Sequence, residues 1–163
     1  MKIAHLDVQR FSLVSQREID DILGKLGDVI GHPEMAAFRR ALESAKTTSE
    51  LKSVVNGAVG PSGLMEFARF DMGAILRIYD KKAPRCFRLL VGNPLTMRQM
   101  AEHVPDAAAY APVTILIDER ADGVHLSYDR MTSFLAPYGN AAAMNVAQEL
   151  DAKIEKLLAE AAG

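Results

Sequence analysis

The chain of 163 residues lacks tryptophan and has a single cysteine, Cys86, and no apolar run approaches the ~18 residues that span a bilayer. One cysteine excludes an intrachain disulfide, which fits a reducing cytoplasmic compartment. Its 19 basic and 21 acidic residues nearly balance, so the charge predicts neither nucleic acid nor a membrane as partner. The segment MKIAHLDVQRF has no apolar core of a signal peptide. We expect a soluble, cytoplasmic, one-domain protein.

The chain begins with a pattern typical of a strand followed by a helix. Along residues 5–14 the apolar positions are first one set of alternate residues and then the other, which predicts a bulge or a change of packing face near Gln9 and Arg10. Ser15 and Glu18 have the spacing of a capping box, and the helical stripe behind them predicts a helix over 19–30.

Two more helices are expected before the main strands. Gly24 and Gly27 lie inside the first helix, where we expect them to allow close backbone packing. The next helix is predicted over 33–46, and Thr47 with Glu50 predicts a capping box for the one after it.

In the second half the apolar period becomes two, which predicts strands over 64–71, 74–79, 86–91, 113–118 and 124–129. Met72-Gly73 is interpreted as the turn of a hairpin between the first two, and Asp122-Gly123 as the turn between the last two. Asn140 is expected to cap a final helix over 141–161. The predicted core includes Leu23, Leu26, Phe87, Leu89, Ile115, Leu150 and Ile154.

The stretch VGNPLTMRQMAEHVPD turns from a strand into a helix at Gly92-Asn93-Pro94. A helix N-terminus can bind anions, but Pro94 removes one N–H donor and Asn93, as the N-cap, occupies another. We expect a structural elbow and keep ligand binding as the alternative. If Asn93 only caps the helix, Asn93→Asp should keep most of the stability.

Charged residues on the strand over 64–71 are the other candidates. Arg69 and Asp71 share one face, and Glu66 is expected on the opposite, apolar face as a rim position, a buried pair or a site residue. The four histidines have no metal-binding spacing, and no nucleophile pattern surrounds Cys86 or the serines. We therefore assign no catalytic or metal-binding residue and leave the cofactor unknown.

Three segments in order, RLLVGNP, HVPDAAAYAPVTILIDE and GVHLSYD, resemble the bacterial and archaeal family called domain of unknown function 302. The resemblance implies one α+β domain over 1–163, with its core over 63–129 and helices packed on a curved antiparallel sheet. It implies association in pairs and no established reaction. Some members carry cysteine where this chain has Gly92, and others carry histidine where it has Met72, so thiol or imidazole chemistry is not expected here. The residues carried over as ligand-binding candidates are Arg69, Asp71, Asn93, Pro94, Pro112 and Asp129.

Three functional hypotheses follow. The first is a non-catalytic module that binds a small ligand or a partner; the apolar residues on both faces of its strands predict that it is a homodimer. The second is an enzyme that uses Arg69, Asp71 and Asp129 on a small substrate. The third is a haem or metal binder with Met72 or a histidine as ligand.

Overall fold

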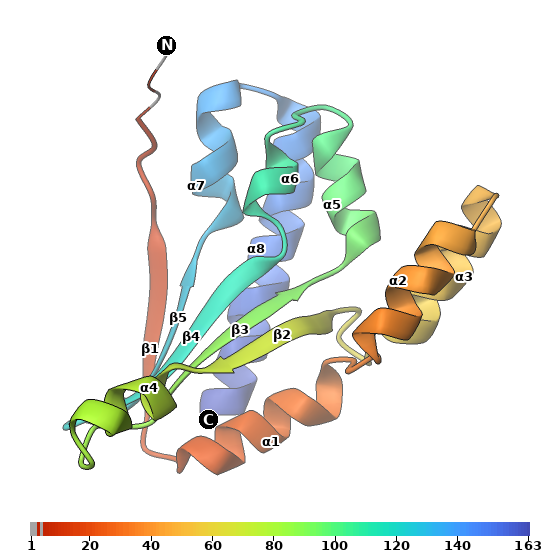
Figure 1. The fold of residues 1–163 in the computed structure, drawn as a ribbon. Coiled ribbons are helices and arrows are strands. Elements are labelled where there is room, and N and C mark those ends of the chain that lie inside the picture. Colours follow the sequence, from red (N-terminus) through yellow and green to blue (C-terminus); the bar gives the residue numbers. More distant parts are fainter. Residues whose placement is uncertain (1–2, 4) are drawn as a thin grey trace.

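A five-stranded antiparallel sheet forms the centre of the fold in a computed structural model, which describes residues 3 and 5–163 (Figure 1). The start of MKIAHLDVQRF therefore lies partly outside the described residues. The strands are β1 (Arg10–Ser15), β2 (Met65–Asp71), β3 (Cys86–Gly92), β4 (Val113–Arg120) and β5 (Gly123–Asp129). Their order is β1-β5-β4-β3-β2, every neighbouring pair is antiparallel, and the sheet is not closed into a barrel. The predicted α+β, single-domain fold is confirmed.

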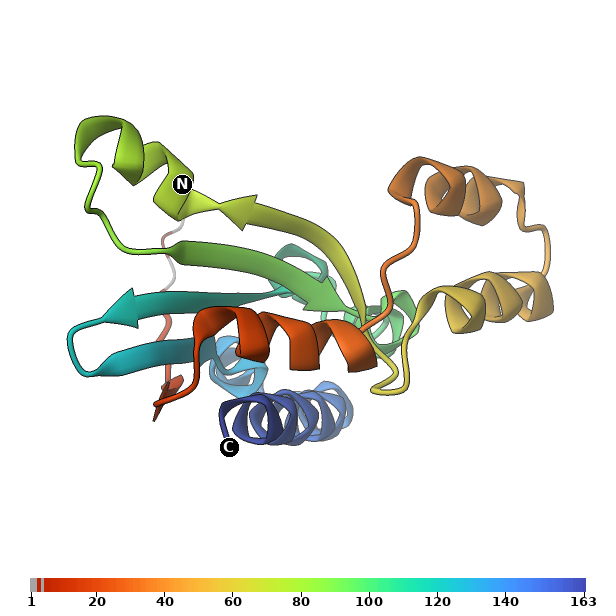
Figure 2. The same ribbon diagram turned by 90° about the horizontal axis from the view of Figure 1, so that it is seen from below.

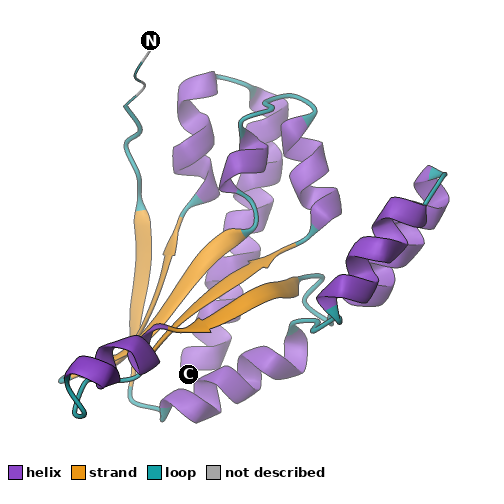
Figure 3. Ribbon diagram, viewed as in Figure 1, coloured by secondary structure: helices purple, strands orange, loops and turns teal. Residues whose placement is uncertain are grey.

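Helices connect all of these strands except β4 and β5, and two more follow β5 (Figure 3). They are α1 (Ile19–Val29), α2 (Met35–Ser44), α3 (Thr48–Ala58), α4 (Met72–Tyr79), α5 (Pro94–Ala101), α6 (Ala107–Tyr110), α7 (Met131–Leu135) and α8 (Ala141–Ala162), with a 3₁₀ turn η1 (Ala136–Tyr138). None of the described helices is long and apolar enough to cross a bilayer.

One face of the sheet carries the core. Helices α1 and α8 lie on the same side of the sheet (Figure 2), and their apolar stripes pack against alternate strand residues. Of the predicted core residues, Phe87 is half-buried at the edge of this cluster, and the following are buried: Leu23, Leu26, Leu89, Ile115, Leu150 and Ile154.

Local signals explain several element ends. The Thr47 hydroxyl accepts a hydrogen bond from the Glu50 N–H (3.1 Å), and the Asn140 side chain accepts one from the Ala143 N–H (3.0 Å). Gly123 has φ 136°, a conformation that favours glycine, and it begins β5 directly after the turn from β4. These caps and this hairpin were predicted correctly.

The predicted hairpin around Met72-Gly73 is wrong. Residues 72–79 form helix α4, and β2 pairs with β3 instead. The Asp71 carboxylate accepts a hydrogen bond from the Ala74 N–H (2.8 Å) and so caps the helix that begins at Met72. The strand interpretation failed because eight mostly apolar residues fit either period.

The first strand and its capping box also differ from the prediction. Residues 5–9 lie outside the sheet, so the phase change marks the start of β1 and not a bulge. Ser15 ends β1, where its hydroxyl donates to the Ala162 carbonyl (2.6 Å), while Glu18 precedes α1 without a side-chain cap.

The expected reason for Gly24 and Gly27 is wrong as well. A Cβ atom on Gly24 would meet no heavy atom within 4 Å, and one on Gly27 would meet only a His32 nitrogen, at 3.8 Å. Close backbone packing therefore explains neither glycine.

The opposite face of the sheet, which we call the open face, is not covered by α2 and α3. These two helices pack together beyond the β2 edge, in a small cluster centred on Phe38, Val55 and Met65 (Figure 1). Leu90 and Leu116 point to the open face and are only half-buried. Within the described part of the chain, the helices near this face are α4 and the ends of α6 and α7, and none of them covers Leu116 as α1 and α8 cover the core face.

Candidate functional site

At the Gly92-Asn93-Pro94 elbow, both the oxygen and the nitrogen of the Asn93 side-chain amide form hydrogen bonds to the backbone. Its Oδ1 accepts a hydrogen bond from the Leu95 N–H (2.8 Å), and its Nδ2 donates to the Gly63 carbonyl (2.9 Å). Pro94 is the first residue of α5. Asn93 therefore caps α5 and joins it to the loop before β2, and neither Asn93 nor Pro94 lines a cavity described below. As ligand contacts, both stay predictions that the geometry does not favour.

Arg69 binds Glu66, which the sequence analysis placed on the wrong face. The register of β2 against β3 shifts between Glu66 and Ala68, so one extra residue, Phe67, brings Glu66 onto the side of Arg69. Their closest approach is 2.8 Å, from Arg69 Nη2 to Glu66 Oε2, and the Glu66 side chain is only 10% exposed. The pair satisfies both charges within the strand.

Asp71 and Asp129 lie on opposite faces of the sheet. Arg69 pairs with Leu89, Leu89 with Ile115, and Ile115 with Tyr128, so Asp129 faces the other way from Arg69 and Asp71. Asp71 caps α4 and forms an ion pair with Arg77 (2.9 Å). The enzymatic hypothesis therefore lacks a shared site.

Asp129 stands on the open face beside Arg10. The Arg10 guanidinium donates from Nε to Oδ1 (2.6 Å) and from Nη2 to Oδ2 (2.8 Å), a two-bond contact with the carboxylate. This hydrogen-bonded pairing lowers the pKa of Asp129, against the effect of its partial burial. Asp129 is thus charge-compensated by its own chain.

A cavity of about 340 Å³ lies on the open face where β3 and β4 meet the segment between α6 and β4. We call it the sheet-face cavity, and its lining includes Arg88, Leu90, Tyr110, Pro112, Thr114, Asp129 and Phe134. A smaller hollow of about 140 Å³ continues it past Thr114 and Asp129 toward Arg10. The cavity contains two of the predicted residues, Pro112 and Asp129, and its size is ordinary for a small-molecule site.

An aromatic pair forms one wall of the sheet-face cavity. The rings of Tyr110 and Phe134 stack with their centroids 4.9 Å apart and an interplanar angle of 14°. The Tyr110 hydroxyl lies 3.0 Å from the Tyr138 hydroxyl, which donates to Asp106 (2.7 Å). Hydrogen bonding to Tyr110 and Asp106 raises the pKa of Tyr138. This chain of bonds fixes the aromatic wall before any ligand arrives.

Arg88 supplies the charge of the sheet-face cavity. Its nearest polar contact is a long one, 3.4 Å from Nη2 to the Thr114 hydroxyl, and within the described part of the chain it forms no ion pair. Since Arg10 already compensates Asp129, the Arg88 guanidinium is the uncompensated charge at this cavity. A guanidinium beside apolar walls suits a ligand that carries a carboxylate.

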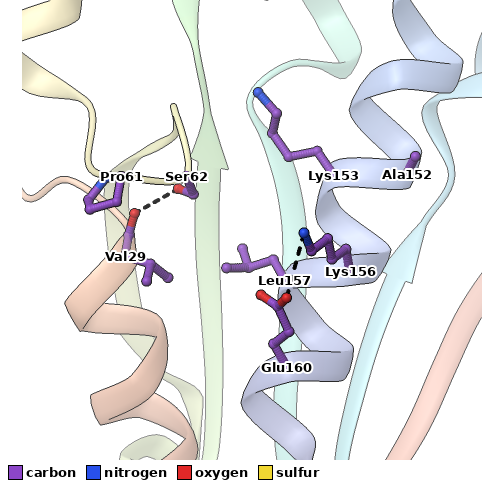
Figure 4. Close-up of a pocket in the computed structure, with 8 residues that line it drawn as sticks. All are labelled: Val29, Pro61, Ser62, Ala152, Lys153, Lys156, Leu157 and Glu160. Carbon is purple, nitrogen blue, oxygen red and sulfur yellow. Dashed lines mark hydrogen bonds and ion pairs between the residues drawn. The ribbon is translucent and has the colours of Figure 1, made fainter.

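A larger cavity, of about 530 Å³, runs between the loop before β2 and α8 (Figure 4). Its cations are Lys153 and Lys156, both on the exposed side of α8, and Lys156 already pairs with Glu160 (3.7 Å). The Ser62 hydroxyl donates to the Val29 carbonyl (2.7 Å), so the loop's polar groups are engaged. Exposed lysines are strongly hydrated, and none of the predicted residues lines this groove, so we favour the smaller cavity.

Asp151 is the polar residue that the sequence analysis missed. It is fully buried in α8, and its carboxylate accepts hydrogen bonds from the N–H groups of Met131 (2.7 Å) and Thr132 (3.1 Å) and from the hydroxyls of Thr132 (2.6 Å) and Tyr128 (2.5 Å). It thus caps α7 from another helix. Burial, and then the nearby Asp151 charge, raises the pKa of Tyr128. An acid within the buried stripe of α8 was the signal that could have revealed it.

The structure gives no support to the third hypothesis, a haem or metal binder. Among the residues that the structure describes, no three His, Cys, Asp or Glu side chains gather as a metal site. Met72 begins α4 and is 37% exposed. Cys86 is partly buried, and this burial raises the pKa of its thiol, which opposes nucleophilic use.

Comparison with known proteins identifies the class that this fold represents. Residues 40–161 match the family described as "Domain of unknown function DUF302", so the chain belongs to that family and the resemblance seen in the sequence is confirmed. A solved structure titled "Crystal structure of uncharacterized conserved protein DUF302 from Bacillus stearothermophilus" is similar over 94% of both chains, with a TM-score of 0.60 and 12% identity. That likeness supports the fold. No curated protein matches, and the family carries no assigned function.

Proposed function

We propose that this protein is a non-catalytic binding module whose sheet-face cavity takes a small organic carboxylate. The observation that carries the proposal is Arg88, which has no acidic partner among the residues that the structure describes and lies beside a stacked aromatic pair in a concave site. Its planar guanidinium can donate two parallel hydrogen bonds to a carboxylate. Leu90, Pro112 and Phe134 offer apolar surface for the rest of the ligand.

The walls of the cavity favour a flat or branched apolar body over a long polar one. The stacked rings of Tyr110 and Phe134 both line the cavity, while Thr114 adds a hydroxyl next to the guanidinium. Among the described lining residues there is no Ser, Cys, His or Lys, and the carboxylate of Asp129 is bound by Arg10. Binding without chemistry is therefore the function that these groups support. The balanced charge and the single cysteine support a cytoplasmic location, and the family resemblance supports a bacterial origin.

Isothermal titration with benzoate and with its neutral analogue benzamide tests the proposal. We expect benzoate to bind, and benzamide to bind at least about tenfold more weakly, because a hydrogen-bonded charge contributes about 1.5–3 kcal/mol. Arg88→Met, which keeps an apolar stem, should lose this preference. Arg39→Met removes an exposed arginine of α2 and is the matched control.

Equal affinity for the acid and the amide would contradict the role of Arg88. Unchanged benzoate binding in Arg88→Met, or a loss in Arg39→Met of the same size, would place the anion elsewhere. If neither compound nor a set of aliphatic carboxylates binds at millimolar concentration, the binding function itself is refuted.

A further inference from the structure

Helix α4 turns its apolar stripe toward the solvent. Met72, Ile75, Leu76 and Tyr79 are spaced i, i+3, i+4 and i+7, which places them on one helical face. Ile75 is 53% exposed, Leu76 50% and Tyr79 89%, and Ile78 beside them is 79% exposed. Such a stripe on a helix normally packs against a core.

The inner side of α4 is occupied by its smallest residue. Gly73 is the buried position, and a Cβ there would lie 2.7 Å from the Cys86 nitrogen and 2.9 Å from the Pro84 carbonyl oxygen. The helix therefore approaches the start of β3 by its backbone and keeps its large side chains outward. It stands on the open-face side of the sheet, opposite α1 and α8 (Figure 2).

The exposed apolar surface here is too large for an ordinary monomer surface. We define the α4 patch as the exposed side chains Phe70, Met72, Ile75, Leu76, Ile78 and Tyr79. Scaled by their exposed fractions, side chains of this size leave roughly 750 Å² open, whereas the largest patch of a typical monomer is about 300–600 Å². An eight-residue helix is also marginal in water without packing of its apolar face.

We propose that the α4 patch is the surface through which two copies of this chain associate, with the α4 helices antiparallel across a two-fold axis. Two such patches would together bury roughly 1,500 Å², the size of a standard specific interface. An antiparallel arrangement brings Asp71 of one copy, which also pairs with Arg77 of its own chain, close to Lys81 and Lys82 of the other copy, which follow the opposite end of the helix. The apolar stripe, the opposing charges and the opposed helix dipoles are then all complementary.

Sedimentation velocity from low micromolar to about 100 µM protein tests this surface. The wild type is expected to be a dimer, and Ile78→Glu and Leu76→Glu should weaken the dimer at least about 30-fold, because each buries a charge in the contact. Val8→Glu changes an apolar residue that is exposed outside the patch and is the matched control, expected to dimerise like the wild type. Since all three positions are exposed, the circular dichroism and urea midpoints should stay close to those of the wild type.

A monomeric wild type across this range overturns the proposal, and so does a dimer that survives both glutamate variants. Cosedimentation with phosphatidylcholine–phosphatidylglycerol vesicles provides the other decisive arm. If the wild type is monomeric and binds vesicles, and Ile78→Glu does not, the patch is a lipid contact and the self-association proposal is wrong. Benzoate titration of the same variants separates this result from the proposed ligand function, because none of the substituted residues lines the sheet-face cavity.

Discussion

Replacing Asp151 by alanine should be among the most damaging polar substitutions in this protein. The carboxylate accepts four hydrogen bonds, of which two come from the N–H groups that begin α7. Without it, the N–H and hydroxyl of Thr132 lose their acceptor and the Tyr128 hydroxyl loses the group to which it donates, while the Met131 N–H still donates to the Tyr128 hydroxyl (3.1 Å). Removing one member of a buried charged network costs about 3–5 kcal/mol, and we expect a loss of this size.

Urea unfolding followed by circular dichroism measures that loss. Asp151→Asn should cost less, about 2 kcal/mol, because its oxygen still accepts on one side while its NH₂ group faces donors on the other. Glu149→Ala, on the exposed side of the same helix, is the control and should change the unfolding free energy by less than about 0.5 kcal/mol. If Asp151→Ala costs no more than Glu149→Ala, the carboxylate does not hold α7, and the account of Phe134 in the cavity wall fails with it.

Three other substitutions give further predictions by the same assay. Leu89→Ala, at a fully buried position of β3, should lose about 2–5 kcal/mol, and a loss below about 0.5 kcal/mol would mean that the strand faces the other way. Asn93→Asp should keep the α5 cap but lose the hydrogen bond to the Gly63 carbonyl. We therefore expect a cost of about 1 kcal/mol, where the sequence alone predicted that most of the stability is kept. An unchanged unfolding free energy would mean that the Gly63 contact does not contribute to stability. Asp129→Asn should cost less than about 1 kcal/mol at pH 7, since the pair is partly exposed. The pKa of Asp129 is lowered in the folded state, so the stability difference between wild type and Asp129→Asn should be present above the unfolded pKa of about 3.9. It should vanish as the pH falls through the lower folded pKa. A stability difference that grows on acidification would contradict the Arg10 contact.

The sequence predicted the elements whose local signals agree with their tertiary use. Thr47 and Asn140 cap helices, Asp122-Gly123 forms a hairpin turn, and Leu89 is buried. These features were predictable because their signals act within a few residues or along one strand face. The α4 segment was misassigned because its short apolar run fits the period of a strand as well as that of a helix. In the structure, the Asp71 cap marks it as a helix.

The candidate site was only partly visible in the sequence. Pro112 and Asp129 line the sheet-face cavity, but Arg88, Tyr110 and Phe134 come together only through the pairing of β3 with β4 and the packing of α6 on α7. These residues are far apart in the sequence, and no periodicity links them, so the sequence alone could not predict that they lie together. A one-residue bulge in β2 likewise reversed the predicted face of Glu66, because every side chain beyond a bulge changes sides.

Nuclear magnetic resonance of the isotope-labelled protein during a benzoate titration tests the central claim most directly. The account predicts that the Arg88 Nε–H resonance and the ring protons of Tyr110 and Phe134 shift together along one binding curve, with the signals of Lys153 and Lys156 unaffected. Shifts confined to those two lysines, or spread evenly over the surface, would contradict the assignment of the sheet-face cavity as the binding site.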